Sequence, residues 1–388
     1  MMRPVSLALE NALAPEHDWR RSAADLAIEV AGPLCQRVPP DLIDALFVAA
    51  PAALLVDGQA AQGAVVADRL GLAVVPCYQL EAGDASGAAA LHAAVAQVGA
   101  GLARAALVVA VSKVSDRSER ERAALCDSLI DREVEAPLGL TYQALCGLLA
   151  DLYLVRHKLK PGDLAHVVAK NAANAVAGGE TFLPHAPSAI EVRRDIPVAP
   201  PLVRSDFAPL FDTATALLVA EAPLARELAA APVEIAGLGA AGDLTVVADR
   251  PDPLRLEAAA RAASKATGAR GIDGLAFLEV SSACSILELL AVESIGVTAP
   301  GTATGRYKDG LGRAGSPLCI NPGGGAQGRG FGFGASGLEQ AREALLQLGA
   351  GAGKRQVAAA SQPGACALSL CLAGLGSQAF ATLYRRPA

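Results

Sequence analysis

The sequence has few aromatic residues and few charges for its length. Of 388 residues, only 4% are aromatic and 19% are charged, against about 25% charged residues in an average soluble domain. The hydrophobic share is still 52%, and it consists mainly of Ala, Val and Leu, accompanied by 39 Gly. A disordered chain is excluded because it would need more solvated surface. A chain of this length forms two cores or one large layered core, and its shortage of charge favours an oligomer.

Basic runs and metal-ligand patterns are also missing. The formal net charge is −6, and no run of five like charges occurs. The electrostatic footprint of a protein that binds nucleic acid or an anionic membrane is therefore absent. The eight Cys include no CxxC pair, and no His is spaced to complete a zinc site. We expect no bound metal.

Nothing in the sequence indicates export. The only apolar stretch near the N-terminus is interrupted by Glu10 and lacks the pattern of a secretory signal. The expected location is the cytoplasm, where thiols stay free. Residues 356–384 carry no charge and are long enough to cross a bilayer. They contain Gln362-Pro363-Gly364 and further Gly residues, which favour two buried strands joined by a tight connection over a membrane helix.

Apolar runs and helical patterns alternate along the chain. In the first part we predict helices at 23–35, 63–70 and 86–103 and strands at 43–50, 73–78 and 106–111. This is α/β patterning with mainly buried sheets. Residues 115–205 are richer in charge and Pro and indicate an inserted subdomain. The pattern then returns with a strand at 213–220 and helices at 254–267, 285–295 and 338–348.

Residues 321–337 are the most distinctive string. Eight Gly occur among these seventeen residues, directly before an amphipathic helix. Such a loop lets the backbone approach a ligand closely, and the helix offers free N–H groups. A phosphate loop is excluded because no Gly-Lys-Ser/Thr follows, and the acidic residue of a dinucleotide-binding motif is missing. A tight structural loop remains the alternative to a ligand-binding loop.

This string resembles the late Gly-rich loop of thiolases. The family pattern is Asn-x-x-Gly-Gly, a spacer, and Gly-His-Pro-x-Gly-Ala-Ser/Thr-Gly. Phe331 stands at the position of the family's catalytic His, and Gly332 replaces its Pro. The residues that shape the loop are present and the imidazole is not. The matching positions are Asn321, Gly324, Gly325, Gly330, Gly334, Ala335, Ser336 and Gly337.

Further segments resemble the same family, in order along the chain. Asp84 stands at the position of the nucleophilic Cys, just before a matching Ala-Ser-Gly. Residues 168–176 resemble the Lys-Asn-x-x-Asn-Ala segment of the sterol-carrier-protein type, and 202–220, with Asp206, Pro209 and Asp212, resemble the end of the family's first half. Ser281 stands at a His or Asn position. Cys371 aligns with the acid/base Cys, and Ala373 replaces the Gly that follows it.

The resemblance implies the thiolase fold, a duplicated α/β core of five layers, αβαβα, with an inserted loop domain. The first half would span 1–225, with the insertion at 115–205, and the second half 226–388. It also implies a homodimer formed across the first half. A coenzyme A thioester would be the substrate or ligand, with no other cofactor bound. The residues that would bind it are Asn321, Gly324, Gly325, Gly334, Ser336 and Ala373.

The candidate catalytic residues are Asp84, Ser281 and Cys371. Thiolase chemistry needs a thiolate nucleophile, and a carboxylate at position 84 is a poorer nucleophile toward a thioester. Asp84 is either a general base or only a helix N-cap. Cys371 is either an acid/base residue or a small buried apolar residue. Phe331 cannot donate to an enolate oxygen, a loss that typically costs about 10²–10³ in turnover, whereas Ser281 could donate one hydrogen bond.

We therefore expect ordinary thiolysis of acetoacetyl-CoA to be absent or very weak. The first hypothesis is an acyl-CoA enzyme with altered carbon–carbon bond chemistry, of the acyl-transfer or retro-aldol type. The alternative is a non-catalytic subunit or acyl-CoA-binding scaffold that works with an active homologue or a small zinc-ribbon/OB-fold partner. A purely structural dimer is a third possibility. The retained Gly loop argues against it, because Gly costs backbone entropy on ordering.

Overall fold

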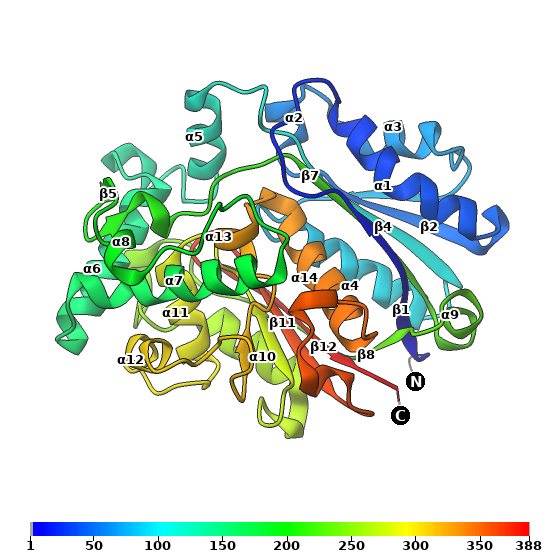
Figure 1. Ribbon diagram of the computed structural model, residues 1–388. Coiled ribbons are helices and arrows are strands. Elements are labelled where there is room, and N and C mark those ends of the chain that lie inside the picture. The colour runs from blue at the N-terminus through cyan, green and yellow to red at the C-terminus, as the bar shows by residue number, and fades with distance from the viewer. Residues whose placement is uncertain (1–2, 388) are drawn as a thin grey trace.

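A single mixed sheet runs through the whole molecule. The computed structural model describes residues 3–387, and ten strands lie in the order β10-β9-β11-β12-β8-β1-β7-β4-β2-β3 (Figure 1). The first-half strands are β1 (Val5–Ala12), β2 (Ile43–Ala49), β3 (Cys77–Leu80), β4 (Ala105–Ser112) and β7 (Thr213–Glu221). The second-half strands are β8 (Val233–Gly242), β9 (Phe277–Val280), β10 (Cys319–Ile320), β11 (Cys366–Ala373) and β12 (Gln378–Arg385).

The two halves repeat one topology. In each half the order in space is first, fifth, fourth, second and third strand. In each half the fifth strand is antiparallel to the first and fourth, while the fourth, second and third run parallel. β1 and β8 pair at Ser6↔Glu234 and Leu7↔Val233, which joins the halves. The repeated order and directions confirm a duplicated core.

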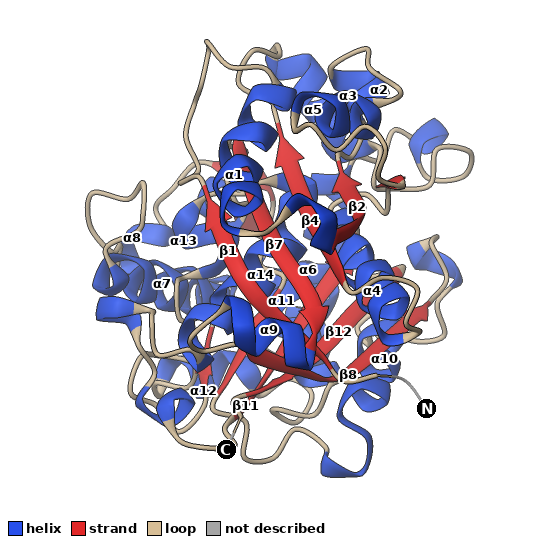
Figure 2. Ribbon diagram, turned by 90° about the vertical axis from the view of Figure 1, so that its right-hand side faces the viewer, coloured by secondary structure: helices blue, strands red, loops and turns tan. Residues whose placement is uncertain are grey.

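The helices complete five layers. Helices α1 (Ala23–Arg37) and α3 (Gln62–Arg69) cover one face of the first-half strands, and Figure 2 shows α1 crossing β1, β7 and β4. Helices α10 (Glu257–Thr267) and α11 (Ser285–Ser294) cover the outer face of the second half. Helices α4 (Ser86–Gly99) and α14 (Ser336–Leu348) lie between the halves, in a shared core. The architecture is αβαβα, as expected.

Small residues allow the two central helices to touch. A Cβ on Gly87 would lie 2.9 Å from the carbonyl oxygen of Gly334, and a Cβ on Gly337 would lie 2.5 Å from the nitrogen of Ala88. Real Cβ atoms do not approach backbone so closely, so both positions require Gly at this helix spacing. The excess of Gly and Ala in the sequence is thus explained in part by the tightly packed middle layer.

The insertion after β4 is mainly helical and contacts the second half. It contains α5 (Glu119–Asp127), α6 (Tyr142–His157), α7 (Pro161–Gly178), α8 (Ala189–Val192) and a two-stranded sheet of β5 (Pro197–Ala199) and β6 (Leu202–Val203). Helix α7 packs against α12 (Ala303–Lys308) and α13 (Gly325–Arg329), which is part of the Gly-rich loop. The insertion therefore positions the Gly-rich loop. Outside the insertion, the first half also contains the short helix α2 (Ala53–Val56), and α9 (Ala222–Leu228) follows β7.

Most predicted elements agree with the structure, and several boundaries differ. The predicted strand at 73–78 begins only at Cys77, and the predicted helix at 86–103 ends at Gly99. Two strands do occupy the uncharged C-terminal segment, but residues 362–364 precede the first of them. The connection lies instead at Gly374–Ser377, where Gly374 and Gly376 have φ of 53° and 88°. Within 3–387 no helix is long and apolar enough to cross a membrane.

Candidate functional site

Asp84 lies between β3 and α4 and joins the two halves. Its side chain is 4% exposed, and its Oδ1 accepts a 2.7 Å hydrogen bond from the backbone N–H of Gly374, in the β11–β12 turn. Helix α4 has Ala85 as its N-cap residue and no side-chain cap, so the interpretation of Asp84 as a helix cap is wrong. Burial raises the pKa of Asp84 to about 7, although the hydrogen bond from Gly374 opposes this rise. The carboxyl group can thus gain and lose a proton near neutral pH.

Cys371 and Ser281 lie together at the ends of two parallel strands. Ser281 follows β9, and its Oγ donates to Cys371 Sγ at 3.8 Å while accepting a 2.9 Å bond from the N–H of Leu372. Cys371 is 1% exposed and packs among Ala85, Ala88 and Ala373. Burial raises the pKa of Cys371 to about 12, and the negative charge of Asp84 adds to the shift. Cys371 is therefore a protonated thiol at neutral pH.

Phe331 closes one side of the site. Its backbone N–H donates to the Pro209 carbonyl at 2.7 Å, and its carbonyl accepts from the Phe211 N–H at 3.0 Å. The ring lies 5.8 Å from that of Phe333, centroid to centroid, in an apolar cluster with Val114 and others. The side chain that replaces the family's imidazole thus lies in a hydrophobic cluster, and it offers no hydrogen-bond donor.

A small cavity brings three of the predicted positions together. Asp84, Ser281 and Phe331 line one cavity of about 20 Å³, which has room for about one water molecule. An acyl group is much larger than this volume, so a thioester can lie beside Asp84 only after lining side chains move. Further side chains line the same space, and sequence reasoning missed most of them: Glu279, Arg329, Glu339 and Gln340, with Ser336 from the predicted set.

The predicted CoA-binding residues divide into two groups. Asn321 is buried, and its side chain accepts from the Val280 N–H at 2.8 Å and donates to Glu288 at 3.0 Å. A Cβ on Gly324 would lie 2.6 Å from the Asn171 carbonyl oxygen, and one on Gly334 would collide with the Pro51 ring. These three positions serve the packing of the loop. The remaining three face the site: Gly325 and Ser336 line the cavity, and Ala373 packs beside Cys371.

A buried ion pair and an Asn side chain support the Gly-rich loop. Lys170 Nζ lies 2.7 Å from Glu288 Oε1, and both side chains are 0% exposed. Asn174, one turn further along α7, donates to the carbonyl oxygens of Gly312, Ile320 and Asn321. The Lys-Asn-x-x-Asn-Ala segment noted in the sequence therefore supports the loop and lies outside the cavity.

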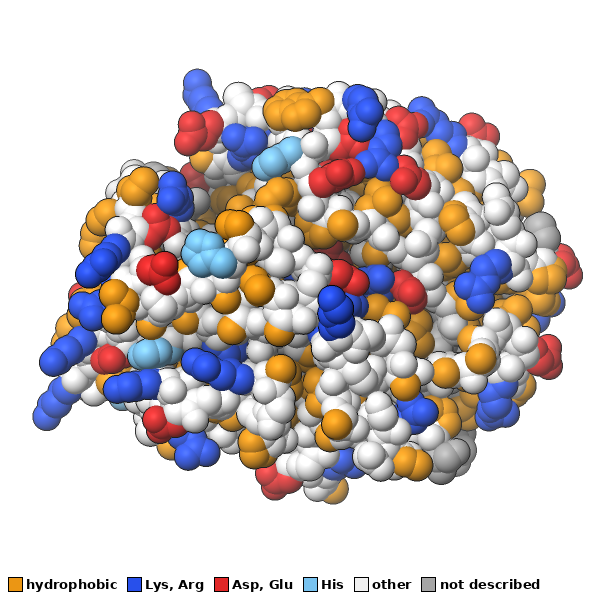
Figure 3. Space-filling view, viewed as in Figure 1, with side chains coloured by type: hydrophobic (Ala, Val, Ile, Leu, Met, Phe, Trp, Pro, Cys, Tyr) orange, Lys and Arg blue, Asp and Glu red, His pale blue; other side chains and the backbone are white. Residues whose placement is uncertain are grey.

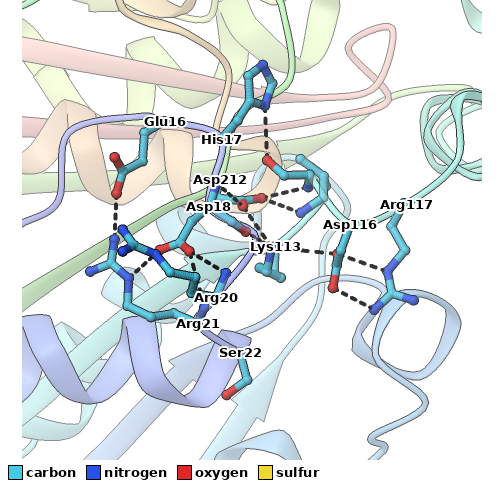
Figure 4. A network of polar contacts seen from close by, with 12 residues as sticks. Glu16, His17, Asp18, Arg20, Arg21, Ser22, Lys113, Asp116, Arg117 and Asp212 are labelled. Atoms are coloured by element: carbon cyan, nitrogen blue, oxygen red, sulfur yellow. Dashed lines mark hydrogen bonds and ion pairs between the residues drawn. The ribbon is translucent and has the colours of Figure 1, made fainter.

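A second polar network surrounds Asp212 at the start of β7 (Figure 4). Asp212 accepts from Lys113 Nζ at 2.9 Å and from the backbone N–H groups of Ser115 at 2.9 Å and Asp18 at 3.1 Å. Asp18 in turn forms an ion pair with Arg21. Asp212 of the 202–220 segment thus ties the chain after β1 to the end of β4. It does not line the cavity of Asp84.

The repeated sheet, the central helix pair and the site between them define the thiolase fold. Residues 239–386 match a family model described as "Thiolase C-terminal domain-like". An acetyl-CoA acetyltransferase of Methanothermobacter thermautotrophicus is 31% identical over 317 residues, 81% of this chain and 82% of that protein. Sterol carrier protein 2 of Rattus norvegicus is 25% identical over 331 residues, 81% of this chain and 59% of that protein.

A solved structure described as "Ltp2-ChsH2(DUF35) aldolase" superposes with a TM-score of 0.84 at 16% identity, covering 99% of this chain and 98% of that one. The chain belongs to the thiolase superfamily. Its fold is that of the family.

Proposed function

We propose that the protein binds acyl-CoA thioesters and that Asp84 acts as a general base in carbon–carbon bond cleavage of the retro-aldol type. The observation that carries this proposal is the state of Asp84, a buried carboxyl group with a pKa of about 7 at the family's nucleophile position. A base with a pKa near the working pH is best suited to accept and return a proton.

Ordinary thiolysis is disfavoured by the same side chains. A carboxylate attacking a thioester would form a mixed anhydride that is less stable than the thioester. Cys371, with a pKa of about 12, keeps its proton, and Phe331 lies in an apolar cluster without a donor for an enolate oxygen. Three positions on which thiolase chemistry depends therefore support a different reaction.

The proposed step balances without a further reactant. The Asp84 carboxylate takes the hydroxyl proton of a β-hydroxyacyl-CoA, the carbonyl forms at Cβ, and the Cα–Cβ bond breaks. The electron pair of that bond moves into the thioester enolate, whose Cα then takes a proton from water, while the proton held by Asp84 is released and restores the balance. Ser281 is the candidate donor to the enolate oxygen because its bond to Cys371 Sγ is long, at 3.8 Å. The likeness to a structure described as an aldolase supports this class of reaction.

The test is a panel of β-hydroxyacyl-CoA and β-ketoacyl-CoA substrates, assayed for release of the carbonyl product. We expect Asp84→Asn to lower the rate by about 10²–10⁴, the usual contribution of a positioned base. Asp57→Asn is the matched control, because burial also raises the pKa of Asp57 and its side chain lies outside the Asp84 cavity. An equal rate for wild type and Asp84→Asn would contradict the proposal.

The small volume beside Asp84 favours a second candidate, a non-catalytic subunit. With about 20 Å³ beside Asp84, the protein could bind the CoA portion of a ligand and leave chemistry to a partner. A neighbour whose description names a second protein, ChsH2(DUF35), supports a search for such a partner. Isothermal titration with CoA and acyl-CoA, together with co-purification, separates the two: binding without turnover by the isolated chain supports the subunit.

We also propose a homodimer across the first half. β3 is the outermost strand of the sheet, and Tyr78 on it is 44% exposed. An unpaired strand edge is a site for pairing with another chain. Sedimentation equilibrium of wild type and Gln79→Pro provides the test, since Pro removes a backbone donor from the edge.

A further inference from the structure

A wide pocket lies on the other side of the side chains that line the Asp84 cavity. This outer pocket has a volume of about 440 Å³ and is lined by Leu13, Thr181, Thr215, Arg329, Glu339 and Arg342, among others. Figure 3 shows this face of the molecule hollowed near its centre, with acidic and basic side chains at the rim. Two of the lining residues, Arg329 and Glu339, also line the inner cavity of about 20 Å³ beside Asp84. They are thus shared between the outer pocket and the inner cavity.

The inner cavity contains polar atoms that the protein itself does not satisfy. Glu279 Oε1, Ser336 Oγ and Gln340 Oε1 are buried and have no hydrogen-bond partner among the described residues, and all three residues line this cavity. Leaving a buried polar atom without a partner costs about 1–3 kcal/mol. One water molecule fits the volume and needs two to four polar partners, which these atoms and Asp84 supply.

Phe331, which also lines the inner cavity, lies among apolar side chains. A proton taken up by Asp84 therefore finds no acceptor at the position where the family has an imidazole. Cys371 also cannot accept it, because it already carries its own proton. The remaining groups at this cavity that can exchange protons are the carboxyl groups of Glu279 and Glu339.

We propose that Glu279 and Glu339 carry protons between Asp84 and the outer pocket, through one water molecule held in the inner cavity. In this step protonated Asp84 gives its proton to the water, which passes one of its own to Glu339, either directly or by way of Glu279. Glu339 then releases a proton to solvent in the outer pocket. One proton moves and no electrons move. Both glutamates act through Asp84 and are positioning residues for the proposed function, on which this inference rests.

The charges around the path suit proton exchange near neutral pH. Burial raises the pKa of Glu279 to about 8; Arg329 and Lys170 oppose the rise, and Glu343 adds to it. Burial also raises the pKa of Glu339, which Arg329, Arg342 and a hydrogen bond from Thr213 oppose. Arg329 itself pairs with Glu343 at 3.3 Å. Its positive charge therefore limits the rise in pKa of both carboxyl groups.

The experiment compares wild type with Asp84→Asn, Glu279→Gln and Glu339→Gln. Glu293→Gln is the control, because Glu293 is buried but bonds to Tyr153 and the Ala303 N–H, away from the cavity. With a cleaved β-hydroxyacyl-CoA we expect both relay variants to lower kcat by up to about 10² with KM unchanged. The first turnover should stay fast, and imidazole should restore kcat, since a small base can enter the outer pocket.

Two outcomes separate this inference from the proposed function. If Asp84→Asn is inactive while Glu279→Gln and Glu339→Gln match wild type, the relay is overturned and the proposed function stands. If Asp84→Asn keeps full activity, or no substrate is cleaved, the proposed function fails. The relay is then tested by carboxyl ¹³C NMR titration of Asp84. Glu279→Gln should shift the titration midpoint of Asp84, whereas Glu293→Gln should not. Equal midpoints in the wild type and Glu279→Gln would overturn the relay.

Discussion

The backbone N–H of Gly374 donates a 2.7 Å hydrogen bond to Asp84 across 290 residues of sequence. The donor belongs to the turn of the second half, and the acceptor stands at the start of the central helix of the first. The carboxyl group therefore reaches its final environment only when both halves have folded and docked. Its raised pKa comes from burial in the assembled core, where the bond from Gly374 partly offsets the rise.

Asp84→Asn should stabilise the protein at alkaline pH. The folded pKa of about 7 lies above the ordinary value of 3.8. The wild type therefore loses the stability that protonated Asp84 contributes as pH rises from 3.8 to 7, and this contribution is fully lost above 7. Each unit corresponds to about 1.4 kcal/mol, so the variant should gain up to about 4 kcal/mol at pH 8. Urea denaturation at pH 8 and pH 4 measures the difference in the free energy of unfolding between variant and wild type. The gain should vanish at pH 4, and an equal gain at both values would contradict the shift.

Thiolysis of acetoacetyl-CoA should be absent or very weak in the wild type, because the nucleophile and the imidazole are both replaced. Cys371→Ala should leave any residual rate unchanged, since a thiol with a pKa of about 12 supplies almost no thiolate at pH 8. The assay follows loss of the acetoacetyl-CoA absorbance with free CoA. Substantial turnover that disappears in Cys371→Ala would show that this reasoning is wrong.

His92 should make the fold sensitive to acid. The side chain bonds to Thr382 at 3.0 Å between α4 and β12, and burial lowers its pKa from 6.5 to about 4. A lowered His pKa gives stability that is complete above 6.5 and lost as pH falls toward 4. Between pH 7 and 4, His92→Gln should therefore lose up to about 3 kcal/mol less stability than the wild type. Denaturation midpoints over this pH range measure the difference. The exposed His185→Gln, with 68% side-chain exposure, serves as the control and should change nothing.

Gly337→Ala should destabilise the fold by separating α4 and α14. Its Cβ would lie 2.5 Å from the nitrogen of Ala88 and 2.6 Å from its Cβ, and overpacking of this kind costs about 1–3 kcal/mol. Gly305→Ala is the matched control, since it is also helical and its Cβ would meet nothing within 4 Å. That variant should be neutral or gain about 0.5–1 kcal/mol. Thermal unfolding distinguishes them, and equal melting temperatures would contradict the close packing.

Lys170→Met should destabilise the protein strongly, because it leaves the Glu288 carboxylate unpaired at 0% exposure. Breaking a buried ion pair on one side costs about 3–5 kcal/mol. The exposed Lys354→Met should have little effect. Guanidinium unfolding measures both. A Lys170→Met variant as stable as the wild type would mean that the Asn171 and Asn321 side chains alone satisfy Glu288.

Periodicity located the long amphipathic helices well, as at 338–348, because one face of each is buried. It failed where tertiary contact decides the outcome. The turn was placed at Gln362-Pro363-Gly364, although Gly374, pressed against Leu129, makes the connection. Asp84, Ser281 and Phe331 were grouped through the family resemblance, since they are far apart in sequence. The role of Glu279 could not be predicted from the sequence. A single Glu in a short apolar run does not reveal its neighbours, and only the fold places it at the same cavity as Asp84.

The repeated strand order gives every position of one half a counterpart in the other. Helices α4 and α14 begin at Ser86 and Ser336, so the counterpart of Asp84, two residues earlier, is Gly334. A side chain at Gly334 would collide with the Pro51 ring. The scaffold is doubled, but space for a functional group exists on one side only. The proposed function therefore predicts one acyl-CoA per chain, despite the internal symmetry.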